Sequence, residues 1–445
     1  MSEWKKVKID FATIKLGDYI EPIKTTVADT GDKNPIVYGV SNKDGISQTG
    51  KPASKDISNY IVLEKDCFAF NPYRINVGSI GVNDENLKGC VSPAYVVFKT
   101  KNGLLPKFLY FYLKSDFGIH LINWYGNRGG VRNALRYSDL CKIDIPDIRH
   151  LNQEKLIKTF SSAWTQIEEL NKEIEKQKNY AKQLRQNILQ EAIEGKLTED
   201  WRKQHPVQKG NPDYDAEALF DKIQAENLET KSSKKTAAPI GEDEIPFDIP
   251  TNWKWVRLGE ISESCLGKML DGIKNQGVNR KYLRNLNVRW FSFDLSDLLE
   301  MRIKDDEFER CSAHRGDLLI CEGGYPGRSA IWNEDYDMCF QKAIHRVRFY
   351  GLPDMPRLFN LFLFWLSESR KIEKYLTGEG IKHLTGVKLK QMILPLPPLA
   401  EQKEIVVRVE AKLQTIAQLE TQIATRETLT KQLMQSILKD AFEEA

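Results

Sequence analysis

The chain has 445 residues, with 65 lysines and arginines against 62 aspartates and glutamates, so its formal net charge is only +3. This length predicts two or three domains. The small positive excess neither requires nor excludes nucleic acid, because a DNA-binding protein can gather its basic residues on one face.

No run of about 18 apolar residues is present, so the sequence predicts no membrane span. The N-terminal stretch MSEWKKVKID lacks the apolar core of a signal peptide. The seven cysteines are widely spaced, without a C-x-x-C pair, which is typical of buried thiols in a reducing cytosol. The six histidines have no metal-ligand spacing. We therefore expect a cytoplasmic protein without a metal site.

The first globular segment, head one (residues 1–149), contains the stretch CFAFNPYRINVGSIGV. Amino-group DNA methyltransferases grip a flipped base with Asn or Asp, two prolines and an aromatic residue, and Asn71-Pro72-Tyr73 is one proline short. Such an enzyme also needs a glycine-rich loop after a strand for its cofactor, and neither F-x-G-x-G nor G-x-G-x-x-G occurs in that setting. We therefore predict that this stretch is a turn between two apolar strands.

The next segment, rod one (residues 150–199), has an apolar seam whose steps alternate between four and three residues. A heptad pattern sustained over more than four repeats predicts a coiled-coil helix, in which polar seam residues fix the register. The seam consists of Leu156, Phe160, Ala163, Ile167, Leu170, Ile174, Gln177, Ala181, Leu184 and Ile188.

A polar linker (residues 200–250) with several prolines follows, and we expect a short helix in it near Ala216 to Asn227. Head two (residues 251–398) then repeats head one in diverged form. The stretch LPKFLYFYLKS matches MPRLFNLFLFWLSES, and GGVRNALRYSDL matches EGIKHLTGVKL with one gap. Counting from Asp66 and Asp317, Asn71-Pro72-Tyr73 falls opposite Glu322-Gly323-Gly324, so the second copy lacks the motif.

The last segment, rod two (residues 399–445), repeats rod one without a gap to the chain end. Antiparallel pairing of the two rods would give the molecule a pseudo-twofold axis; the alternative is that each rod packs on its own head or on another chain. The seam of rod two consists of Ile405, Val409, Lys412, Ile416, Leu419, Ile423, Arg426, Thr430, Leu433 and Ile437.

Over essentially its full length, the chain resembles the specificity subunits of Type I restriction-modification systems. The strongest carriers of this resemblance are LPLPPLAEQKEIVVRVEAKL and its weaker twin IDIPDIRHLNQEKLIKTF, together with EAIEGKLTEDWR. In the twin, Asp147, Ile148 and Arg149 replace Leu396, Pro397 and Pro398, which blurs the first domain boundary.

The resemblance implies a mixed α/β (α+β) fold with two target recognition domains and an antiparallel coiled coil of two long helices. It implies double-stranded DNA, two modification (methyltransferase) subunits and restriction (ATP-dependent translocase and endonuclease) subunits as partners, and no membrane. No cofactor is expected in this chain, because S-adenosylmethionine would belong to the modification subunit. The chain would be non-catalytic and would read a split, asymmetric DNA target for phage defence.

Candidate DNA-binding residues are basic and amide side chains, which neutralise phosphates or form paired hydrogen bonds to base edges. For each of them, a solvated surface residue is the alternative, and Arg74, Asn76 and Arg328 could instead cap turns. The candidates are Asn42, Lys43, Gln48, Lys51, Arg74, Asn76, Arg128, Arg132, Asn133, Arg136, Lys274, Arg280, Lys281, Arg284, Arg328, Lys342, His345, Arg346, Lys382 and His383.

Other functions remain as alternatives. Glu401-Gln402-Lys403 resembles the E-x-K of nucleases, but it opens a helix, and its twin is Asn152-Gln153-Glu154. We expect Gln402 and Gln153 to lie in a first helical turn, where a polar side chain can satisfy free backbone N–H groups. The remaining rivals are a self-contained methyltransferase, a specificity subunit of another methylation-based phage-defence system, and a coiled-coil scaffold that binds no DNA.

Overall fold

The computed structural model describes residues 12–49, 56–126, 134–230 and 239–443. The chain forms two compact units, one of residues 1–176 with 423–445 (unit 1) and one of residues 177–422 (unit 2). The boundaries that we predicted for heads, rods and linker follow the sequence repeat rather than these units, and they stay a prediction. Within the described residues, no helix is both long and apolar enough to cross a membrane.

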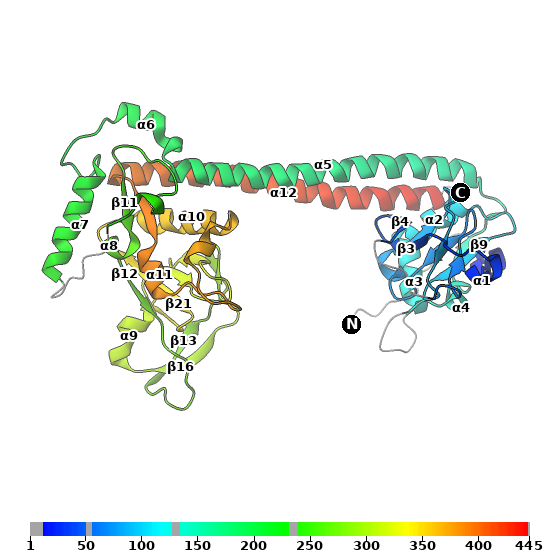
Figure 1. Ribbon diagram of the computed structural model, residues 1–445, viewed down its shortest axis with the longest axis horizontal. Helices are drawn as coiled ribbons and strands as arrows, with labels where there is room; N and C mark the ends of the chain where they lie inside the picture. Colours follow the sequence, from blue (N-terminus) through cyan, green and yellow to red (C-terminus); the bar gives the residue numbers. More distant parts are fainter. Residues whose placement is uncertain (1–11, 50–55, 127–133, 231–238, 444–445) are drawn as a thin grey trace. The chain divides into compact units, whose positions relative to one another are not determined.

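Unit 1 contains two four-stranded sheets, ordered β2-β9-β6-β7 and β4-β3-β8-β5, and the two-stranded pair β1-β10. Short helices α1, α2, α3 and α4 surround them (Figure 1). The bounds are β1 Thr13–Lys15, β2 Ile20–Pro22, α1 Val27–Thr30, β3 Val37–Ser41, β4 Gly45–Gln48, β5 Ile61–Val62, β6 Phe68–Phe70, β7 Ile80–Val82, β8 Cys90–Val91, β9 Val96–Thr100, α2 Pro106–Lys114, α3 Asp116–Gly126, α4 Tyr137–Leu140 and β10 Asp144–Pro146.

The core of unit 1 is aromatic. In the first sheet the rings of Phe68 and Phe98 stack at 4.8 Å, and Phe70 meets Phe98 edge to face. Helix α2 begins with Pro106 at a position where the missing N–H costs no hydrogen bond, and it buries Phe108 in the same cluster. These aromatic side chains supply most of the apolar area that holds the sheet and α2 together.

Unit 2 contains the strand orders β12-β21-β18-β19 and β16-β13-β20-β17, the pair β11-β22 and the small hairpin β14-β15. The bounds are α6 Glu199–Gln204, α7 Ala216–Thr230, β11 Lys254–Arg257, α8 Leu258–Ile261, β12 Ser262–Leu266, β13 Val278–Leu283, β14 Val288–Arg289, β15 Ser292–Phe293, β16 Leu299–Ile303, α9 Asp305–Cys311, β17 Ser312–Ala313, β18 Leu318–Cys321, β19 Ser329–Ile331, β20 Met338–Phe340, β21 Ile344–Phe349, α10 Met355–Glu368, α11 Gly386–Gln391 and β22 Ile393–Leu396.

The two units have the same strand orders, which confirms the predicted internal repeat. In each second sheet, one strand pair is parallel, β3 with β8 and β13 with β20, and the neighbouring pairs are antiparallel. The pairs β1-β10 and β11-β22 join the first and last strand of each head. The mixed α/β fold class is therefore confirmed, and helix α7 confirms the predicted helix in the linker.

The helices α5 (Gln153–Ile193) and α12 (Leu399–Glu443) each contribute residues to both units. In unit 1, Ile437 near the end of α12 packs on the cluster that includes Phe160 of α5. In unit 2, Arg185 of α5 donates to Glu420 of α12 at 2.5 Å. The beginning of each helix thus lies beside the end of the other, which confirms the antiparallel pair (Figure 1).

The buried side of this helical pair is narrow. Every seventh residue is buried, at Phe160, Ile167, Ile174, Ala181 and Ile188 in α5 and at Val409, Ile416, Ile423 and Thr430 in α12. The alternate seam leucines, Leu170, Leu184, Leu419 and Leu433, are between 41% and 47% exposed. Two helices alone cannot cover both seam positions of these heptads, so an apolar stripe stays open to solvent.

The strand register corrects the predicted correspondence across the repeat by one residue. Phe68 of β6 pairs with Phe98 of β9, which in turn pairs with Pro22 of β2. Leu318 of β18 pairs with Val347 of β21, which in turn pairs with Ser264 of β12. Phe68 and Leu318 therefore occupy the same place in the two sheets. Asn71 therefore corresponds to Cys321 rather than to Glu322. The wrong correspondence came from aligning Asp66 with Asp317. The sequences around them have diverged so far that an alignment error of one residue cannot be detected from the sequence. The second copy still lacks the motif.

Candidate nucleic-acid interface

The Asn-Pro-Tyr stretch connects β6 to β7, which pair antiparallel, so the predicted turn is confirmed. The Asn71 side chain accepts a hydrogen bond from the Tyr73 amide at 3.0 Å and shapes the turn. The Leu135 amide donates to the Pro72 carbonyl at 3.0 Å, which places Leu135 and the following Arg136 beside this loop. Head one thus brings two separate predicted regions together.

The turn between β3 and β4 reaches the same place. Asn42 lies against Gly78, and the Lys114 ammonium donates to the Asn42 carbonyl and side-chain oxygen, both at 2.9 Å. Burial lowers the pKa of Lys114 to about 8. Lys114 was not among the predicted candidates, and nothing in its helical setting distinguished it. It fixes the β3–β4 turn against the end of α2 and so positions Asn42 and Lys43.

The equivalent loop of head two connects β18 to β19 and is rich in glycine because the backbone is crowded there. A Cβ at Gly323 would lie 2.8 Å from the His383 ring, and Gly324 has a left-handed φ of +74°. The Leu384 amide donates to the Glu322 carbonyl at 2.8 Å, as Leu135 does to Pro72 in head one. In both heads, an equivalent backbone hydrogen bond therefore holds the same two loops together.

The structure divides the candidate residues into groups by their surroundings. Ten are exposed, and Asn76 is half-buried. Lys51, Arg128, Arg132 and Asn133 lie outside the described residues. The exposed ones are Asn42, Lys43, Gln48, Arg74, Arg136, Lys274, Lys281, Lys342, Lys382 and His383.

The remaining candidates make internal contacts. Arg280 and Arg284 are half-buried and paired with Asp305 and Asp297 at 2.8 and 2.6 Å. The buried ones are Arg328, His345 and Arg346. Each has a hydrogen bond to a backbone carbonyl: Arg328 donates to Asn285 at 2.8 Å, His345 contacts Leu384 at 2.8 Å, and Arg346 donates to Ser312 at 2.5 Å. Arg346 also lies 3.6 Å from the Glu263 carboxylate. Strand β21 carries His345 and Arg346 into the domain, so these buried residues support the fold and do not face DNA directly.

Two histidines of unit 2 should make its stability depend on pH in opposite directions. Burial lowers the pKa of His314 and nearby Arg348 adds to this, but hydrogen bonds to Asp337 and Glu309 at 2.6 and 3.0 Å outweigh both, so the pKa is raised above 6.5. Its stabilisation is complete below that ordinary value and is lost as pH rises through the higher folded-state pKa. Burial lowers the pKa of His345, so its contribution is lost as pH falls through the lower value.

Urea unfolding between pH 5 and pH 8 checks this expectation. His314→Asn should remove part of the decline on the alkaline side, by less than about 1 kcal/mol because the ring is partly exposed. His345→Gln, which keeps a side-chain donor, should flatten the acid side. Profiles that match the unmodified chain would contradict both assignments.

A buried carboxylate ties the linker to the start of α12. Glu401 is 0% exposed, and its two oxygens accept hydrogen bonds from Thr198 at 2.7 Å, Asn252 at 3.2 Å and Trp253 at 2.8 Å, and from the Arg202 guanidinium. The sequence EGKLTEDWR thus contacts the sequence PLAEQKE. Both stretches carry the family resemblance, but no local spacing shows that residues 202 and 401 meet.

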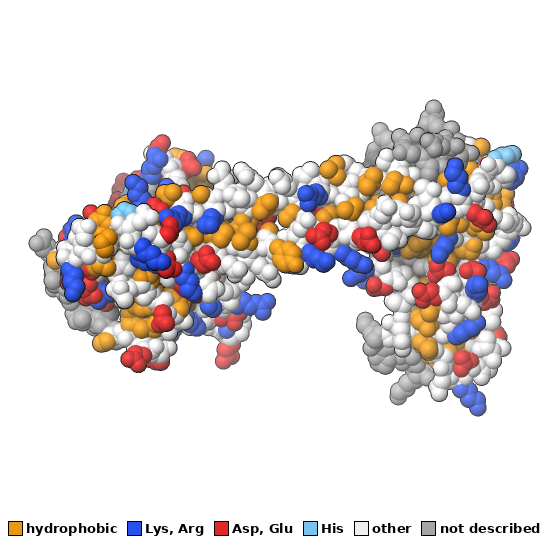
Figure 2. All heavy atoms as spheres, turned by 90° about the horizontal axis from the view of Figure 1, so that it is seen from above, with side chains coloured by type: hydrophobic (Ala, Val, Ile, Leu, Met, Phe, Trp, Pro, Cys, Tyr) orange, Lys and Arg blue, Asp and Glu red, His pale blue; other side chains and the backbone are white. Residues whose placement is uncertain are grey.

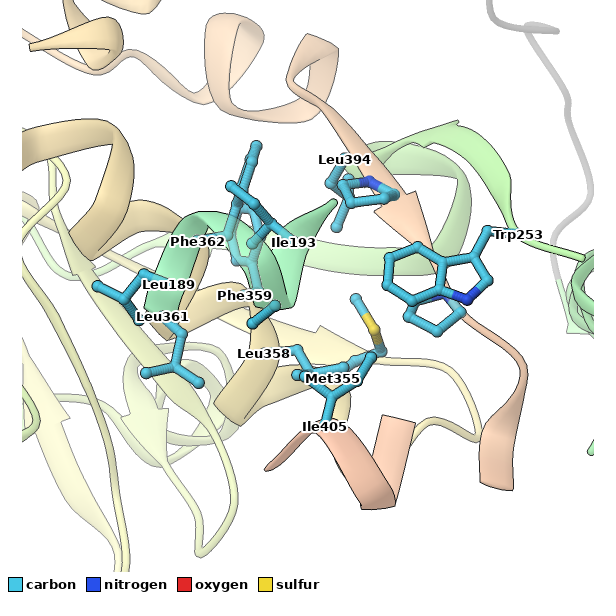
Figure 3. Close-up of a pocket in the computed structure, with 13 residues that line it drawn as sticks. Leu189, Ile193, Trp253, Met355, Leu358, Phe359, Leu361, Phe362, Leu394 and Ile405 are labelled. Atoms are coloured by element: carbon cyan, nitrogen blue, oxygen red, sulfur yellow. The ribbon is translucent and has the colours of Figure 1, made fainter. Parts of the chain in front are cut away.

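The prolines before α12 end β22 and lead into this contact. An apolar crevice beside it is lined by Leu189 and Ile193 of α5, Met355 and Phe359 of α10, and Ile405 of α12, whose side chains converge in Figure 3. The Leu399 and Ala400 amides donate to the Pro212 and Asp213 carbonyls at 3.1 and 3.2 Å, so the linker also caps the helix.

Of the two glutamines, Gln153 satisfies a backbone N–H group as expected, whereas Gln402 bonds to a backbone carbonyl instead. Gln402 donates to the Pro397 carbonyl at 2.8 Å. Gln153 accepts from the Leu105 amide and donates to the Gly103 carbonyl, both at 2.9 Å. Neither caps its own helix in this way, because side chains in the first turn point back towards the preceding segment.

Comparison with known proteins places this architecture. Residues 250–426 match the family model described as "Type I restriction modification DNA specificity domain". The EcoDI specificity subunit of Escherichia coli is 23% identical, over 98% of this chain and 89% of that protein. The chain thus carries a Type I restriction-modification DNA specificity domain, and it is similar to a specificity subunit over almost its whole length.

Two further specificity subunits are matched over less of their length. The EcoAI specificity subunit of Escherichia coli is 26% identical over 54% of this chain and 41% of that protein. The EcoKI subunit of Escherichia coli K12 is 23% identical over 68% of this chain and 57% of that protein. The chain therefore spans about half the length of these two curated relatives.

A solved structure supports the fold. A chain from the structure titled for complex assembly and conformational transition of the type I R-M system aligns with a TM-score of 0.66 at 17% identity, over 98% of this chain and 99% of that one. The likeness extends through both heads and both long helices of this chain. At this level of identity it bears on the fold alone.

Proposed function

We propose that this chain is the DNA-recognition subunit of a Type I restriction-modification complex. Each head reads one part of a split, asymmetric DNA target, and the chain itself carries out no chemistry. One observation carries this proposal. The two heads have the same strand order and hold corresponding loops together with an equivalent backbone hydrogen bond, while the side chains on those loops differ. A shared frame with different exposed groups suits two different half-sites.

The modification subunits are proposed to dock on the helical pair. Besides the open seam leucines, Tyr180 on α5 and Val407 and Leu429 on α12 are more than half exposed, at 65%, 56% and 57%. Figure 2 shows apolar side chains, in orange, along these helices. Continuous exposed apolar stripes are typical of protein-binding surfaces. Restriction subunits would join the assembled complex through these partners.

S-adenosylmethionine is proposed to bind in the modification subunit, and this chain needs no cofactor of its own. The target adenine would be flipped out of the duplex into that partner, because chemistry on a base requires leaving the stack. This chain would determine which DNA sequence is recognised and how far apart the half-sites lie, and it would hold the subunits together. A specificity subunit of another methylation-based defence system would share these features and differ in its partners.

Methylation mapping tests the proposal. The chain is expressed with its neighbouring modification subunit in a methylation-free host, and the DNA is sequenced by a modification-sensitive long-read method. We expect N6-methyladenine on both strands of a split motif, which vanishes when this chain is omitted. A stable complex without methylation would favour a scaffold that binds no DNA or a different partner enzyme.

A further inference from the structure

Both heads present one exposed tyrosine on the same hairpin loop. Tyr73 on the β6–β7 loop is 62% exposed, and Tyr325 on the β18–β19 loop is 60% exposed. The strands on either side are equivalent in the two sheet orders, although the loop sequences NPYRINVGS and EGGYPGR share little. The two tyrosines do not occupy equivalent positions in the loops, yet each diverged loop exposes one aromatic side chain, which suggests a task common to the two half-sites.

Both loops are held firmly, so each ring is displayed at little cost in entropy. In head one, the loop is fixed by the Asn71 turn and the Leu135–Pro72 backbone bond. In head two, Glu322 is fixed by Leu384, and the loop backbone packs directly on His383 and on Asn285, whose side chain donates to the Gly323 carbonyl at 3.1 Å.

One face of the Tyr325 ring is already covered by a cation. The Arg328 guanidinium lies 3.9 Å from the ring centre and is itself buried, held by the Asn285 carbonyl. Cation–π attraction holds a guanidinium on one face of an aromatic ring and leaves the other face for stacking on a nucleobase. Arg328, predicted as a base reader, thus supports the ring from behind.

The charge around both loops favours nucleic acid over a protein partner. The head-one loop, residues 71–79, contains Arg74 and no acidic residue, and Arg136 lies beside it. In head two, residues 370–390 contain six lysines and arginines against two glutamates, and this segment meets the loop at Leu384 and at Ile372, which lies against Gly327. Phosphates are attracted to such surfaces.

We propose that Tyr73 and Tyr325 each stack on DNA at one half-site, in a contact that does not depend on base sequence. The inference rests on the proposed function, because a duplex exposes a base face only where it is locally unstacked, as when the partner extrudes an adenine. Every base has a π-face, so stacking tolerates any sequence. The two tyrosines would anchor both heads alike, while neighbouring side chains distinguish the half-sites.

The test uses the complex with its modification subunits and a duplex that carries the mapped motif. Tyr73→Ala and Tyr325→Ala should each weaken DNA binding about 5- to 150-fold. Tyr73→Phe and Tyr325→Phe should bind as the unmodified complex does, since the ring is kept. Tyr336→Ala is the matched control, because Tyr336 is 50% exposed and lies beyond the other end of β19.

Two readouts separate stacking from other roles. The dependence of Kd on salt should be unchanged in the alanine variants, because tyrosine releases no counterion, whereas Arg74→Ala should lower the slope by about one. The methylated motif should also stay the same. Unchanged affinity, a changed motif, or loss of the modification subunit from the complex would each overturn the inference and leave the proposed function intact. An unmodified complex without specific DNA binding would overturn both.

Discussion

Replacing Glu401 by alanine should destabilise unit 2 by about 3–5 kcal/mol, because it leaves the Arg202 guanidinium partly buried and without its charge partner. The same change removes the acceptor for Thr198, Asn252 and Trp253. Buried donors that lose their acceptor keep the cost of desolvation and gain nothing in return. Urea unfolding followed by circular dichroism measures the loss.

A surface ion pair in the same segment provides the control. Glu199 pairs with Lys203 one helical turn away, and both side chains are more than half exposed, so Glu199→Ala should cost less than about 1 kcal/mol. A double-mutant cycle of Glu401→Ala with Arg202→Ala should show a strong coupling. If Glu401→Ala is no more damaging than Glu199→Ala, the buried contact does not hold the linker to α12.

Lengthening both long helices equally should widen the gap in the DNA target. Three extra heptads after Ala181 in α5 and after Ile423 in α12 add 21 residues to each helix, about 31 Å at about 1.5 Å per residue. At about 3.4 Å per base pair, this corresponds to about nine base pairs, close to one turn of DNA. Both positions lie within four residues of the Arg185–Glu420 ion pair, so the insertions stay matched.

Methylation mapping reads out the result. We expect the same two half-sites with a gap that is longer by about nine base pairs. A matched insertion of two heptads is the control, because about six base pairs place the second half-site on the opposite face of the duplex, and methylation should fall sharply. An insertion in α5 alone should abolish it. A change in the half-sites themselves would show that the helices take part in base reading.

Much of the architecture could be predicted because it depends on local periodicity. Heptads with a step of three or four residues determine helices such as α5 and α12 without any tertiary information. The repeat also predicted two heads of one fold, and the apolar runs around Asn71-Pro72-Tyr73 predicted a hairpin. In each case the signal lies within a few residues of the element that it predicts.

The candidate site was predicted less well, because exposure depends on which face a strand buries. His345 and Arg346 lie on β21, which pairs with a neighbouring strand along each of its two edges. The order of polar residues along β21 therefore did not show that these two side chains are buried. Arg328 lies beneath Tyr325 rather than in front of it. Glu401 and Arg202 are 199 positions apart in the sequence. A local sequence pattern cannot predict a contact between residues that far apart in the chain.

The sequence by itself determined the repeat, the long helices and the family resemblance, because each depends on local periodicity or on contiguous motifs. Only the tertiary structure decided that Asn71 corresponds to Cys321, that four of the five seam leucines stay exposed, and that a tyrosine is exposed on the same loop in both heads. These depend on the register between strands and on which faces other elements cover. Both follow from the packing of segments that are far apart in the chain.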